Sequence, residues 1–156
     1  MALLEIFDPK APPKPIGIDL GTTNSLVAFV KNERPVAVAD CNGEVLLPSV
    51  VSYTDRGVVV GRDAKALALE HPRETIVSVK RFMGRGGDDA ETRRLAPYEF
   101  AQPGEGEANV VRFKVRERTL TPVEVSAEIL RALKRLAEDE LRNVGGAVIT
   151  VPAYFD

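Results

Sequence analysis

Apolar residues recur along the chain with two spacings, and each spacing predicts a different kind of element. Alternating or short continuous apolar runs, bounded by Gly, Pro and Asn, predict strands at 16–20, 26–30, 36–39, 46–53 and 58–60. Helical composition and spacing predict helices at 62–70, 74–83 and 122–142. Short strands are expected within 98–120, and the nearly continuous apolar run at 147–151 predicts a strand buried on both faces. The mixture predicts an α/β fold.

The predicted helix at 122–142 has the clearest boundaries. Thr121 is a good N-cap, Pro122 suits the first helical position, and Glu124 completes a capping box. Apolar residues at helical spacing lie close to one stripe. The helix is therefore expected to pack in the core and to carry no chemistry.

The stretch at 17–25, Gly-Ile-Asp-Leu-Gly-Thr-Thr-Asn-Ser, joins the first two predicted strands in a hairpin. Its tip suits a polyphosphate and a metal ion, because Gly21 allows close backbone approach and successive N–H groups form an anion-binding concavity. Asp19 offers hard oxygens to Mg²⁺ or its waters. An ordinary hairpin with a polar turn is the alternative for Gly-Thr-Thr alone. Asp19 favours phosphate, since it lies two residues before Gly21 on the same strand face.

Composition and charge exclude several classes of function. With 156 residues the chain is long enough for one domain with a real core, and its net charge of -2 gives no broad basic field, so no nucleic-acid partner is expected. No apolar run is long enough to span a membrane, and no signal peptide is recognised, so a cytoplasmic protein is expected. A single cysteine excludes an intramolecular disulfide and a cysteine metal cluster, and a single histidine excludes a zinc site built from several histidines. Cys41 is expected to be a small buried or half-buried thiol.

Two further segments, Ser-Val-Lys-Arg-Phe-Met-Gly-Arg at 78–85 and Ala-Val-Ile-Thr-Val-Pro-Ala-Tyr-Phe-Asp at 147–156, follow the hairpin in order. Together the three segments resemble the Hsp70 chaperones, within the actin/hexokinase/Hsp70 ATPase superfamily. The resemblance implies an actin-like ATPase (ribonuclease H-like) fold, of which this chain would contain the first lobe only.

The resemblance also implies a division of the chain. After an extended, proline-rich leader at 1–15, residues 16–156 would form a truncated nucleotide-binding domain. In it, 16–50 and 122–156 would belong to subdomain IA, and 51–121 to subdomain IB. The second lobe would lie beyond the chain, which ends directly after a predicted central strand. The fragment alone is therefore expected not to hydrolyse ATP at a useful rate, although the full-length parent would be an ATP hydrolase.

Site residues follow from the resemblance. It implies that ATP or ADP and Mg²⁺ are bound, with Asp19 near the metal through water and the phosphates contacted by Gly21, Thr22, Thr23 and Asn24. Lys80 would place the attacking water and steady charge on the γ-phosphate. Pro152 would help to couple the nucleotide state to a peptide-binding domain. Local sequence alone instead predicts Lys80 to be a solvated residue near the end of the helix at 74–83.

Within the family, the segments at 1–4, 46–51, 96–100 and 154–156 resemble the HscA branch, which serves iron–sulfur cluster assembly. For the full-length protein this implies a J-domain co-chaperone, an iron–sulfur scaffold client and binding of unfolded or extended peptide. A general DnaK-like folding chaperone is the alternative within the family, and a small-molecule kinase is the alternative within the superfamily. Because the missing lobe would bare an apolar surface, the fragment is expected to self-associate.

Overall fold

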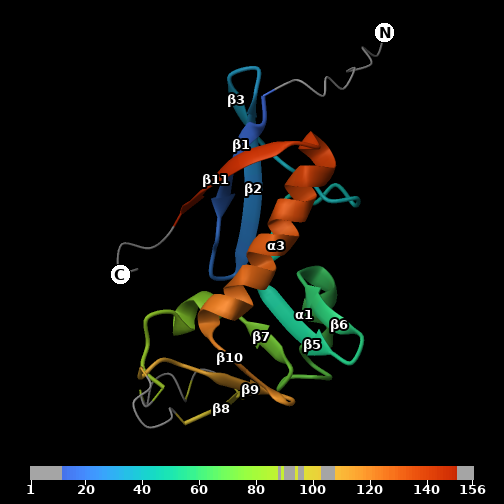
Figure 1. Ribbon diagram of the computed structural model, residues 1–156. Helices are drawn as coiled ribbons and strands as arrows, with labels where there is room; N and C mark the ends of the chain where they lie inside the picture. Colours follow the sequence, from blue (N-terminus) through green and yellow to red (C-terminus); the bar gives the residue numbers. More distant parts are fainter. Residues whose placement is uncertain (1–11, 88, 90–93, 95–96, 103–107, 151–156) are drawn as a thin grey trace.

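The structure is a computed structural model that describes residues 12–87, 89, 94, 97–102 and 108–150. Most of the leader, residue 151, Pro152 and the ending at 154–156 lie outside the described residues. Along the described chain, one long helix, α3 (Pro122–Leu141), runs between a sheet near one end of the molecule and two small sheets near the other (Figure 1).

The larger sheet contains the predicted hairpin. It consists of β1 (Lys14–Asp19), β2 (Asn24–Lys31), β3 (Arg34–Ala37), β4 (Leu47–Pro48) and β11 (Val144–Thr150). The order is β11-β1-β2-β3, and the short strand β4 also pairs with β2. β1 is antiparallel to β2 and parallel to β11, so residues from near both ends of the chain lie side by side.

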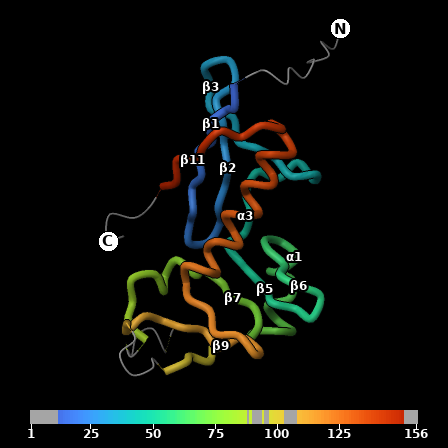
Figure 2. Tube along the Cα trace, in the orientation of Figure 1, coloured from blue at the N-terminus to red at the C-terminus, as the bar shows by residue number. Residues whose placement is uncertain are grey.

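The second group of elements contains two three-stranded sheets. One consists of β5 (Val50–Thr54), β6 (Gly57–Val60) and β7 (Thr75–Val77), with the helix α1 (Arg62–Leu67) between β6 and β7 in the chain. The other consists of β8 (Glu99–Phe100), β9 (Phe113–Val115) and β10 (Arg118–Leu120). A short 3₁₀ helix, η1 (Val79–Phe82), follows β7. The tube in Figure 2 shows how the chain passes from this group into α3 and returns to the larger sheet.

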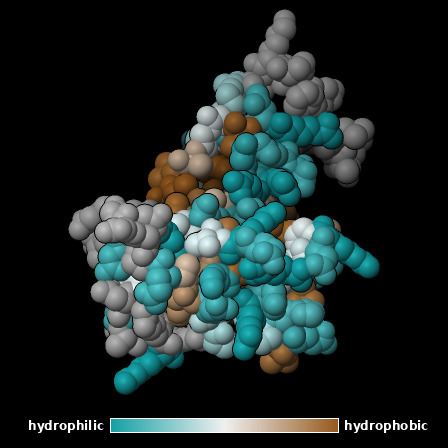
Figure 3. Space-filling view, turned by 60° about the horizontal axis from the view of Figure 1, so that its bottom comes forward, coloured by the Kyte–Doolittle hydropathy of each residue, from teal (hydrophilic) through white to brown (hydrophobic). Residues whose placement is uncertain are grey.

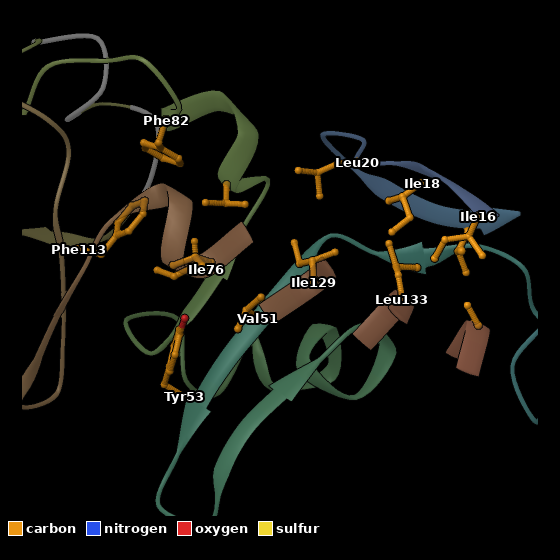
Figure 4. Close-up of a cluster of buried hydrophobic side chains, with 14 of the residues drawn as sticks. Ile16, Ile18, Leu20, Val51, Tyr53, Ile76, Phe82, Phe113, Ile129 and Leu133 are labelled. Atoms are coloured by element: carbon orange, nitrogen blue, oxygen red, sulfur yellow. The ribbon is translucent and has the colours of Figure 1, made fainter. Parts of the chain in front are cut away.

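Helix α3 begins as predicted. Thr121 accepts a hydrogen bond from the Glu124 backbone and the Glu124 side chain accepts one from the Thr121 backbone, which confirms the capping box. Ile129 and Leu133 are fully buried, and they pack in one cluster with Ile18, Val51 and residues of both small sheets (Figure 4). The helix thus joins the sheets through a single core.

The predicted helix at 74–83 is wrong. Residues 75–77 form β7 instead, because the β-branched run Thr-Ile-Val pairs with β5 on the sheet. Ser78 then adopts a left-handed conformation with φ of 55°, which separates the strand from η1. The predicted strand at 46–53 is also divided, into β4 and β5, with Ser49 between them. β1 starts at Lys14, two residues earlier than predicted.

Two predictions of burial are wrong as well. β11 lies at the edge of the larger sheet, and its residues 145–150 are exposed, with Val148 at 72%, so its faces are not covered by the described residues. Cys41 is exposed in a turn. The surface accordingly includes hydrophobic side chains, and the face shown in Figure 3 carries a hydrophobic patch among hydrophilic ones.

Candidate functional site

The loop at 20–23 joins β1 to β2 and is the tip of the predicted phosphate-binding hairpin. It is closed so tightly that a Cβ atom at Gly21 would lie 2.0 Å from the Asn24 carbonyl oxygen. Only glycine fits there without a shift of the backbone. Among the described residues, none accepts a hydrogen bond from the N–H of Thr22 or Thr23. The loop therefore offers backbone donors at an accessible turn, as an anion-binding site requires.

Asp19 ends β1 directly before this loop, and its side chain is exposed. The parallel register places Thr150 of β11 opposite it, and the Thr150 hydroxyl donates to Asp19 Oδ1 at 2.8 Å. No described side chain bonds to Oδ2. Within the described part of the chain no group of three His, Cys, Asp or Glu side chains could hold a metal ion. The exposed carboxylate of Asp19 beside the loop offers hard oxygens of the kind that Mg²⁺ prefers.

Lys80 reaches the same loop from η1. Its Nζ atom donates a hydrogen bond to the Leu20 carbonyl oxygen at 2.6 Å, across 60 residues of sequence. Val79 and Phe82, both 2% exposed, fix η1 in the core. Lys80 is thus not the solvated helix residue that its local sequence predicts.

An aromatic cluster supports η1 from the side of the sheet formed by β8, β9 and β10. The Phe82 ring lies 5.1 Å from the Phe113 ring and 5.8 Å from the Tyr98 ring, between centroids. The Tyr98 hydroxyl accepts a hydrogen bond from the Val77 N–H at 2.8 Å. Burial raises the pKa of the Tyr98 phenol above its ordinary value, which further disfavours the ionised form. These contacts hold the turn that carries Lys80.

Sequence reasoning missed two residues behind the loop, Ser25 and Ser49, each 1% exposed. The Gly21 N–H donates to Ser25 Oγ at 3.2 Å, Ser49 Oγ donates to the Gly21 carbonyl at 2.9 Å, and the two hydroxyl oxygens are 2.9 Å apart. The available signal was the polar Ser49 within the apolar run at 46–53.

The structure brings together Asp19, Gly21, Thr22, Thr23 and Lys80 around one loop. Asn24 is exposed and begins β2, so it lies next to this group. Pro152 lies outside the described residues. A cation, a carboxylate and backbone donors at a glycine turn form a set that can bind anionic oxygens and a hard metal ion.

Comparison with known proteins shows the family of the chain. The family model described as "Hsp70 protein" matches residues 15–156. The chain is 53% identical over 165 aligned positions to proteins named "Chaperone protein HscA homolog" from Burkholderia multivorans and Burkholderia mallei, covering 100% of this chain. A homolog of the same name from Burkholderia pseudomallei shows the same identity. The chain spans 26% of the length of these relatives. None of the helices in the described residues is long and apolar enough to cross a membrane. The chain belongs to the Hsp70 family.

Proposed function

We propose that this chain is part of an ATP-dependent chaperone of the HscA type, and that it forms the first lobe of an actin-like nucleotide-binding domain. One observation carries the proposal. Lys80, 60 positions from Leu20, approaches the hairpin tip at which backbone donors and Asp19 are gathered. A glycine turn that only supports a hairpin has no need of a distant ammonium group. The identity to HscA homologs supports the branch.

The residues fit a nucleotide with its metal ion. Thr22 and Thr23 would donate backbone N–H bonds to phosphate oxygens at the turn that Gly21 keeps open. Asp19 would hold Mg²⁺, through water, with the carboxylate that Thr150 orients. Bound ATP with its magnesium ion supplies the phosphoryl group that is transferred. Lys80 would orient the attacking water and stabilise negative charge in the transition state, since positioning and electrostatics provide most of the catalysis in this chemistry.

The proposed partners are those of an HscA-type chaperone, a J-domain co-chaperone and an iron–sulfur scaffold protein with an extended recognition segment. Because the chain spans 26% of its relatives, these partners are proposed for a longer protein that carries this segment. The isolated chain is expected to bind nucleotide weakly.

A chimeric protein tests the proposal, with residues 15–156 replacing the matching part of the Burkholderia multivorans HscA homolog. We expect ATPase activity that rises with a J-domain protein and scaffold together and falls at least a hundredfold in Lys80→Ala. Lys114→Ala is the matched control, because this exposed lysine pairs with Glu99 at 3.0 Å and contacts no loop residue among those described. Stimulation by unrelated unfolded peptides but not by scaffold would favour the DnaK-like alternative, and sugar-dependent turnover would favour a kinase. Unchanged turnover in Lys80→Ala would refute its role.

A further inference from the structure

Two buried serines close a ring of hydrogen bonds behind the hairpin tip. Gly21 donates its N–H to Ser25, and Ser49 donates its hydroxyl to the Gly21 carbonyl. Each serine has one hydroxyl hydrogen, and that of Ser49 is already used. The 2.9 Å contact between the two oxygens must therefore be donated by Ser25. Every donor in the ring has an acceptor, and both serines are only 1% exposed, so water hardly competes with it.

The ring sets the direction of the two peptide groups at the tip. Peptide groups are planar, and no cis peptide bond occurs in the described residues, so the C=O and N–H of each group point to opposite sides. With the Gly21 N–H turned toward Ser25, the Leu20 carbonyl of the same group faces away, and Lys80 bonds to it there. With the Gly21 carbonyl turned toward Ser49, the Thr22 N–H points to the side away from Ser49.

Ser49 also contacts the element that carries Lys80. Its N–H donates to the Thr23 carbonyl at 2.8 Å, and its own carbonyl accepts the N–H of Ser78 at 3.1 Å. Ser78 is the residue directly before η1. Ser49 is therefore bonded to Gly21 and Thr23 of the loop and to the residue that precedes η1, from which Lys80 extends.

We infer that Ser49, with Ser25, is a positioning residue for phosphoryl transfer: it orients the Leu20 carbonyl that holds the Lys80 ammonium and the Thr22 N–H that is offered to phosphate. This inference rests on the proposed function. Neither hydroxyl reaches the outer side of the loop, so the serines act through Lys80 and the loop backbone. Their loss would weaken an arrangement needed in the transition state more than ground-state binding of the nucleotide.

The competing explanation is that Ser49 only fills space in the core. Three variants separate this packing role from a role in orienting the loop. Ser49→Ala removes the hydroxyl and leaves the Gly21 carbonyl without its donor. Ser49→Cys keeps a similar shape but supplies only a weak donor. Ser52→Ala is the matched control, because Ser52 is 0% exposed and its hydroxyl accepts a hydrogen bond from Thr75 at 2.9 Å, away from the loop.

The first measurement is hydrogen exchange at the Gly21 amide in the chain itself, resolved by NMR. Ser49→Ala and Ser49→Cys are expected to speed exchange at Gly21 at least tenfold, whereas Ser52→Ala leaves it within twofold of the unaltered chain. Equal exchange at Gly21 in the unaltered chain and in Ser49→Ala would overturn the inference. So would an effect in Ser49→Ala that is absent in Ser49→Cys, because packing would then explain it.

The second measurement is ATP turnover by the chimera. Loss of one hydrogen bond corresponds to a factor of about two to ten in rate. We expect kcat to fall by such a factor in Ser49→Ala and Ser49→Cys, with KM for ATP within twofold and Ser52→Ala unchanged. An unchanged kcat, or a rise in KM alone, would overturn the inference. A chimera without any ATPase activity would instead refute the proposed function, and Gly21 exchange would still decide whether the serines orient the loop.

Discussion

Gly21→Ala tests whether the hairpin tip is built on a close backbone contact. The added Cβ atom would lie 2.0 Å from the Asn24 carbonyl oxygen, whereas such contacts below 3.0 Å are essentially never found, so the two groups must separate by about 1 Å. That shift strains the bond from the Gly21 N–H to Ser25, already 3.2 Å long, and the pairing of Asn24 with β4.

The size of the effect follows from these two interactions. Each hydrogen bond contributes about 0.5–1.5 kcal/mol to the free energy of unfolding, so their loss costs about 2 kcal/mol. For a chain of this length that lowers Tm by about 4–8 °C. Gly17→Ala is the matched control on the same hairpin, since its Cβ atom would meet only the Ala28 carbonyl oxygen, at 4.0 Å. Its stability is expected to stay within about 0.5 kcal/mol of the unaltered chain.

Urea unfolding followed by circular dichroism provides the comparison, with the slope m checked for constancy so that the midpoints report stability. Gly21→Ala should unfold at clearly lower urea than Gly17→Ala. If both variants unfold at the same urea concentration, the loop accommodates a methyl group, and the reasoning from close contact at Gly21 is refuted.

Three further perturbations address the core, the helix cap and the sheet edge. Leu133→Ala should destabilise the chain by about 2–5 kcal/mol in urea unfolding, because Leu133 is fully buried in the core; a loss below 1 kcal/mol would contradict its role. The hydrogen bonds from the backbone and hydroxyl of Thr121 lower the pKa of Glu124, so its ionised form stabilises the folded state above the unfolded pKa, and this contribution is lost as pH falls through the folded value. The stability gap between the unaltered chain and Glu124→Gln should therefore shrink from pH 7 to pH 3, and a constant gap would argue against the cap. Val148, 72% exposed on the charge-free edge strand β11, should promote pairing with a second copy. Sedimentation should then show concentration-dependent association that Val148→Lys abolishes. A monomeric unaltered chain would refute the predicted pairing through β11.

Local patterns predicted the elements whose stabilising contacts are close in sequence. The hairpin of β1 and β2 needed only a turn between two apolar runs, and α3 was marked by Thr121, Pro122 and Glu124 at its start. The helix predicted at 74–83 failed because β7 is defined by its partner β5, more than twenty residues earlier. The β-branched run at 75–77 was the signal that should have favoured a strand.

The exposure of β11 and the gathering of the site residues were harder to predict from the sequence, since both depend on which elements lie side by side in the fold. An apolar run such as 147–151 has the same composition in a central strand and at an edge, so the sequence could not reveal that β11 is exposed. The position of Lys80 likewise depends on a contact across 60 residues. It was expected near the phosphate only from the resemblance to Hsp70 chaperones.

The topology explains how residues so far apart in the chain reach one loop. Parallel strands need a long crossover connection, and between β1 and β11 this connection ends with α3, whose 20 residues span about 30 Å. The crossover returns the chain so that Thr150 pairs with Asp19 at the end of the hairpin strand that leads into the loop. The same connection also contains β5, β7 and η1. Ser49, directly before β5, and Lys80, in η1, both bond to the loop at 20–23. The small sheets therefore do more than extend the core: their packing against α3 fixes how closely the lysine and the serine approach the loop.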